Sequence, residues 1–107
     1  MHFRTMLATA LISAGALTTA APSEAQQLPT ALALTCATCH GTDGRAVSGA
    51  GMVSLRGLDR QYLLDQLKAF REGTRPATVM HQIAKGYTPE QIEQLAGYFS
   101  SLPRVAP

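Results

Sequence analysis

The sequence has only two cysteines, few charged residues and no block of basic residues. Charged residues make up 15% of its 107 residues, with nine Lys and Arg against seven Asp and Glu, so its net charge is +2. This bias is much weaker than the Lys/Arg-rich segments typical of proteins that bind polyanions. No run of alternating polar and apolar residues indicates strands, and no second long apolar run follows the one at the N-terminus. We therefore expect no nucleic-acid partner and no stable membrane span after that first segment.

Residues 1–25 have the pattern of a secretory signal peptide. Arg4 precedes an apolar stretch over residues 6–21, and the small-residue sequence Ser-Glu-Ala ends the segment. The alternative, an uncleaved anchor, fits less well because the apolar stretch is short and rich in Ala and Thr. We predict cleavage near Ala25, a periplasmic protein, and one small domain over residues 26–107.

The sequence "TCATCHGTD" places Cys36 and Cys39 three residues apart, with His40 directly after the second. If residues 30–40 form one helix, the two thiols lie on the same face and His40 lies one turn from Cys36. Two thiols so placed can add to the vinyl groups along one edge of a porphyrin while the imidazole binds the iron. Cys-x-x-Cys-His is accordingly the pattern of covalent attachment of a c-type haem.

Two cysteines can also serve in a zinc site, a redox site or a disulfide. A structural zinc site needs four N or S ligands, whereas His81 is the only further histidine after residue 25 and no third cysteine exists. A thioredoxin-like site should lie in a βαβ pattern, which is not found. A disulfide between Cys36 and Cys39 remains an alternative, because paired cysteines are normal in an oxidising compartment.

Few residues could occupy the second axial position of the iron. After removal of the signal peptide the candidates are Met52, Met80 and His81. We favour Met80, because a helix and a proline precede it and let the chain reach the far side of the haem, whereas Met52 follows His40 too closely. The alternatives are Met80 as a core residue, Met52 as a loop residue over a haem edge, and His81 as a surface histidine.

Two further helices are predicted from capping signals. Asp59 is a natural N-cap for one helix, which Gly73 ends. Thr88 begins the other with Pro89 at its first position, and Pro103 ends it. Their expected buried residues are Leu63, Leu67 and Phe70 in the first and Ile92, Leu95, Phe99 and Leu102 in the second. With the motif helix they predict an all-α fold with three main helices around one haem.

These segments resemble the class I c-type cytochromes over essentially all of residues 26–107. "CATCHGTDG" resembles the attachment site, and "YLLDQLKAFREGTRP" and "IEQLAGYFSSLP" resemble helices of the branch that contains cytochromes c4 and the cytochrome subunit of flavocytochrome c sulfide dehydrogenase. "TVMHQIAKGYT" is most similar to that subunit. The resemblance implies the class I cytochrome c fold, thioether bonds at Cys36 and Cys39, and axial iron ligands His40 and Met80.

The resemblance implies a one-electron carrier that accepts electrons from an FAD-containing sulfide dehydrogenase and is not catalytic alone. A freely diffusing c4- or c5-like shuttle is the first alternative, and a haem-based gas-binding or sensing module the second. Two features depart from the branch: many members have two tandem haem domains, and a proline often precedes the pair equivalent to Ser54 and Leu55.

Overall fold

The computed structural model describes residue 15 and residues 19–104, so most of the predicted signal peptide lies outside the described residues. The described part is helical, in the order α1 (Glu24–His40), the 3-10 turn η1 (Thr42–Gly44), α2 (Arg60–Glu72), α3 (Met80–Lys85) and α4 (Pro89–Ser101). The predicted all-α fold with three main helices is confirmed, and α1, α2 and α4 are those helices. Among the residues that the structure describes, no helix is both long and apolar enough to cross a membrane.

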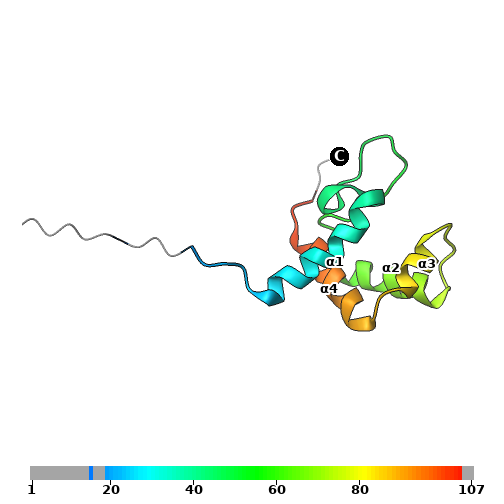
Figure 1. Ribbon diagram of the computed structural model, residues 1–107. Coiled ribbons are helices and arrows are strands. Elements are labelled where there is room, and N and C mark those ends of the chain that lie inside the picture. Colours follow the sequence, from blue (N-terminus) through cyan, green and yellow to red (C-terminus); the bar gives the residue numbers. More distant parts are fainter. Residues whose placement is uncertain (1–14, 16–18, 105–107) are drawn as a thin grey trace, which may run out of the picture.

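Helix α4 lies at the centre of the fold. It packs against α1 and α2, while α3 packs against α2 and η1 against the end of α1 (Figure 1). The core residues come from α1, α2 and α4 and are Ala33, Leu63, Leu64, Ile92, Leu95, Ala96 and Phe99. The predicted face of α4 is therefore correct except at its end, since Leu102 is only partly buried. In α2, Leu64 is buried with Leu63, whereas the predicted Leu67 and Phe70 are partly exposed.

The capping signals of α2 and α4 act as the sequence predicts. The Asp59 carboxylate accepts a hydrogen bond from the backbone N–H of Tyr62 at 2.9 Å. Thr88 and Gln91 form a reciprocal capping box at the start of α4, with distances of 3.1 and 2.9 Å. Because each cap satisfies backbone donors that would otherwise lack partners, both helices begin at the predicted residues.

The ends of two elements differ from the prediction. Helix α1 begins at Glu24 rather than near residue 30, and the backbone N–H of Ser23 donates to Gln26 Oε1 at 3.2 Å. Pro29 therefore lies inside the helix, which removes one backbone hydrogen bond. The six-residue α3 was not predicted, because it is short and Val79 provides no side-chain cap.

Gly44 closes the turn after the motif and is buried against α4. Its φ is +70°, and a Cβ there would lie 2.9 Å from the Phe99 ring and 3.0 Å from Leu55 Cβ. We expect Gly44→Ala to lower the free energy of unfolding by about 2–4 kcal/mol, because backbone strain and overpacking add. Gly49→Ala is the matched control, since Gly49 has φ +79° but open space around the same position. Denaturant unfolding of the holoprotein measures both, and equal losses would contradict the steric explanation.

Candidate functional site

The Cys-x-x-Cys-His motif occupies the last turn of α1. Cys36 is half-buried against the core, Cys39 is exposed, and both are free thiols in the structure. The helix ends at His40, where Gly41 has φ +81° and donates its N–H to the Ala37 carbonyl at 2.9 Å. The helix thus holds both sulfur atoms on one side, as the spacing predicts.

His40 has the environment of an iron ligand. Its Nδ1 lies 2.6 Å from the backbone carbonyl oxygen of Val53. Because a carbonyl only accepts, Nδ1 carries a hydrogen, and in the neutral ring Nε2 then retains its lone pair. Nε2 is buried and has no hydrogen-bond partner among the described residues. Metal-binding histidines typically donate their other ring N–H to a carbonyl in this way, so His40 fits a haem iron.

The donor set around His40 also fits a covalent haem. Two thiols and one imidazole with a free lone pair lie on the same helix within five residues. They match the groups that a c-type haem needs. Four of the exposed large apolar side chains lie in the loop after the motif and around the start of α3, where they could cover the apolar surface of a porphyrin. These side chains are Met52 (41% exposed), Val53 (59%), Val79 (54%) and Ile83 (45%).

The loop that presents the Val53 carbonyl is fixed by its own hydrogen bonds. The Ser54 hydroxyl accepts from the Ala46 N–H at 3.0 Å, and the Leu55 N–H donates to the Gly44 carbonyl at 2.9 Å. The Val53 carbonyl, which accepts from His40, is therefore kept in place by the hydrogen bonds of the two residues that follow it. No side-chain motif in the sequence marks this carbonyl.

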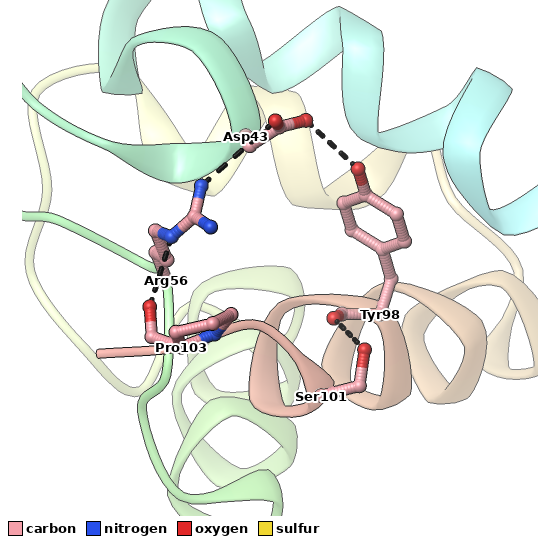
Figure 2. A network of polar contacts seen from close by, with 5 residues as sticks. All are labelled: Asp43, Arg56, Tyr98, Ser101 and Pro103. Atoms are coloured by element: carbon pink, nitrogen blue, oxygen red, sulfur yellow. Dashed lines mark hydrogen bonds and ion pairs between the residues drawn. The ribbon is translucent and has the colours of Figure 1, made fainter. Parts of the chain in front are cut away.

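A polar network joins this loop to the end of α4 (Figure 2). The Tyr98 hydroxyl donates to Asp43 Oδ1 at 2.9 Å, and a guanidinium nitrogen of Arg56 lies 3.8 Å from Asp43 Oδ2. Arg56 Nε also donates to the Pro103 carbonyl at 2.9 Å. Asp43 adopts a left-handed conformation with φ +52°, which turns its carboxylate towards both partners. The turn directly after the motif is thereby tied to the C-terminal helix.

These network residues were not recognised from the sequence as a group. Arg56 looks like one of several surface cations, yet its side chain is only 17% exposed and is paired. Burial raises the pKa of Tyr98 above its usual range, and the hydrogen bond to the Asp43 carboxylate raises it further. The Tyr98 hydroxyl therefore stays protonated, and able to donate, to a higher pH than a free tyrosine.

The candidate second axial ligands lie on different segments. Met80 is the first residue of α3 and is half-buried, whereas Met52 is exposed in the loop after the motif. His81 is half-buried with a buried Nδ1 that lacks a hydrogen-bond partner among the described residues, so it is less exposed than a surface histidine. Met80 and Ile83 are three residues apart and share a face of α3. The assignment of Met80 to the iron remains a prediction.

Comparisons with known proteins point to one family. The family model described as Cytochrome c matches residues 29–103. The chain is 44% identical over 73 residues to the cytochrome subunit of sulfide dehydrogenase from Chlorobaculum tepidum, which covers 68% of this chain and 64% of that protein. It is 41% identical over 93 residues to the thiosulfate dehydrogenase electron acceptor of Thiomonas intermedia, covering 87% of this chain and 42% of that protein.

A solved structure of cytochrome c4 from Acidithiobacillus ferrooxidans has a similar fold. The TM-score is 0.64 and the sequence identity 34%, and the match covers 73% of this chain and 49% of that chain. The chain thus spans less than two thirds of the length of each of these three proteins.

Proposed function

The chain belongs to the cytochrome c family, and on this basis we propose that it is the cytochrome subunit that accepts electrons from a flavoprotein sulfide dehydrogenase. Its role as an electron carrier with a covalently bound c-type haem follows from the family itself. The sulfide dehydrogenase partner is supported by the similarity to the Chlorobaculum tepidum subunit. The observation that carries the site is the buried, unpartnered Nε2 of His40, whose Nδ1–H is donated to Val53.

We assign four residues to the haem. Cys36 and Cys39 would form the two thioether bonds, His40 would be one axial ligand of the iron, and Met80 the other. Bound haem supplies a centre that gains and loses one electron. The Val53 carbonyl keeps the ring of His40 oriented and its Nε2 free of hydrogen. Since axial ligand, hydrogen bonding and burial tune such a centre, these residues would set its reduction potential.

The cleaved export signal belongs to the same proposal. Cleavage near Ala25 would leave residues 26–107 as one periplasmic domain with one haem, and it would remove Ser23 and the first two residues of α1. The helix would then begin nearer Pro29, a residue well suited to a first helical turn. The motif begins about two turns further on, so its geometry would be preserved.

A freely diffusing shuttle is the second candidate. The similarity to the thiosulfate dehydrogenase electron acceptor of Thiomonas intermedia supports it, because that protein is named as an electron acceptor and not as a subunit. In both cases this chain accepts single electrons and a separate protein carries out the chemistry on the sulfur compound.

Size-exclusion chromatography of the native protein tests the partner. Haem absorbance and flavin fluorescence are followed together in extract from the organism that makes the protein. We expect both signals in one peak, at a mass well above that of a single small domain. A haem peak at monomer mass, combined with no faster reduction by sulfide when the flavin-containing fractions are added back, would overturn the subunit proposal in favour of the shuttle.

A further inference from the structure

Tyr87 connects two segments that are far apart in the sequence. Its hydroxyl is hydrogen-bonded to Thr35 Oγ1, 52 residues away and directly before Cys36. The Thr35 hydroxyl also lies 2.7 Å from the Leu32 carbonyl, which can only accept. Thr35 therefore uses its single hydrogen on Leu32, and the Tyr87 hydroxyl is the donor to Thr35. The bond joins the helix of the motif to the segment that follows α3.

The backbone of Tyr87 is fixed to the end of α3. Its N–H donates to the Ala84 carbonyl at 3.3 Å, and the preceding Gly86 N–H donates to the Ile83 carbonyl at 3.1 Å. The ring packs against the core, and Thr88 caps α4 immediately afterwards. Any movement of α3 away from α1 must therefore stretch or break the hydroxyl contact.

Helix α3 packs extensively against α2 but has little direct contact with α1. It has six residues, lacks a side-chain cap at Val79, and has Ala84 as its one fully buried residue. Its packing is against α2, which does not carry the motif. A helix this short is held by tertiary contacts rather than by its own hydrogen bonds. The bond from Tyr87 to Thr35 is thus well placed to decide how α3 lies relative to α1.

The hydroxyl pair lies beside one of the proposed attachment sulfurs. Thr35 Oγ1 is 3.9 Å from Cys36 Sγ. Burial raises the pKa of the Cys36 thiol. Tyr87 is therefore linked to Thr35, the residue directly before Cys36.

We propose that the Tyr87 hydroxyl is a positioning group that fixes where α3, and with it Met80, lies relative to the helix that carries Cys36 and His40. It does not touch the iron itself; it keeps the Met80 thioether in place by donating to Thr35. This role rests on the proposed function, because it assumes that Met80 is the second axial ligand.

The positioning role of Tyr87 can be tested in the ferric holoprotein by adding imidazole, which competes with Met80 for the iron. Imidazole binds the iron only when Met80 leaves, so its apparent affinity reports how firmly α3 is held. We expect Tyr87→Phe to increase that affinity about fivefold, which corresponds to about 1 kcal/mol, the net value of one hydrogen bond. Titration followed by haem absorbance measures the affinity, and phenylalanine keeps the ring that packs against the core.

Three further variants isolate the hydrogen bond. Tyr62→Phe is the matched control, because Tyr62 is an exposed tyrosine of α2 whose hydroxyl makes no hydrogen bond among the described residues, and it should bind imidazole as the wild type does. Thr35→Val should reproduce the fivefold increase without adding to that of Tyr87→Phe in the double variant. Thr35→Ser retains the acceptor and should restore the wild-type affinity.

Met80→Ala separates failure of this role from failure of the proposed site. If Met80→Ala strongly increases imidazole affinity but Tyr87→Phe leaves it unchanged, the positioning role is wrong and the ligand assignment stands. If Met80→Ala also leaves it unchanged, Met80 is not a ligand and both proposals fail. An equal increase in imidazole affinity in Tyr87→Phe and Tyr62→Phe would likewise overturn the role, because the increase would then not depend on the hydrogen bond to Thr35.

Discussion

Serine at both Cys36 and Cys39 is expected to abolish covalent haem completely. The hydroxyl of serine cannot form the thioether bonds that join the porphyrin to the chain, so haem should dissociate on denaturation. The haem stain should survive denaturing electrophoresis in the wild type and disappear in the double variant. Intact-mass measurement should give the polypeptide mass with one haem for the wild type and the polypeptide mass alone for the variant.

The single variants provide the control for this prediction. Cys36→Ser and Cys39→Ser each leave one thiol, so each should retain the stain through one bond. Cys36 packs against the core whereas Cys39 is exposed, so we expect Cys36→Ser to lower the free energy of unfolding more. A wild-type chain without stain, whose Cys36 and Cys39 are joined by a disulfide that a reducing agent opens, would refute covalent haem attachment.

Loss of the covalent haem should also weaken the fold. The described residues form a core of few side chains, in which Phe99, Ile92 and Leu95 are the largest that are fully buried. Domains of this size usually depend on a disulfide, a metal or a cofactor to supplement such a core. Thermal unfolding followed by circular dichroism should therefore show a lower midpoint and a broader transition in the double cysteine variant.

The parts of the fold that the sequence predicted well are those set by local signals. Asp59 and Thr88 cap α2 and α4, and each capping bond spans only three residues. The prediction placed the start of α1 near residue 30, whereas the helix begins at Glu24 and continues through Pro29. Helix α3 has too few residues to show a hydrophobic period and no cap to mark its start, so it could not be predicted.

The same distinction applies to the site. Cys36, Cys39 and His40 could be predicted together because one helical turn fixes their spacing. The group that accepts the hydrogen bond of His40 is the backbone carbonyl of Val53. Because every residue has a backbone carbonyl, no residue type in the sequence predicts this contact. The contacts of Asp43 with Arg56 and Tyr98 depend on how the loop and α4 meet, which the sequence pattern does not contain.

Met80→Ala is expected to have the second large effect, on the reduction potential. A methionine ligand raises the potential of a haem, and axial ligands together span about 0.8 V. Removing the thioether should lower the potential by on the order of 0.1 V or more and change the absorbance spectrum of the oxidised protein. Redox titration followed by haem absorbance measures both effects in the same sample.

Met52→Ala is the matched control for Met80→Ala. Met52 is the other methionine that remains after the predicted cleavage, and it lies exposed in the loop after the motif, so its loss should leave the potential and the oxidised spectrum close to those of the wild type. His81→Ala should behave in the same way, because adjacent residues of α3 point in different directions and cannot both bind one iron. If Met80→Ala were also silent, the second axial position would be open or held by another residue. A gas-binding module would then explain the chain better than an electron carrier with two protein ligands.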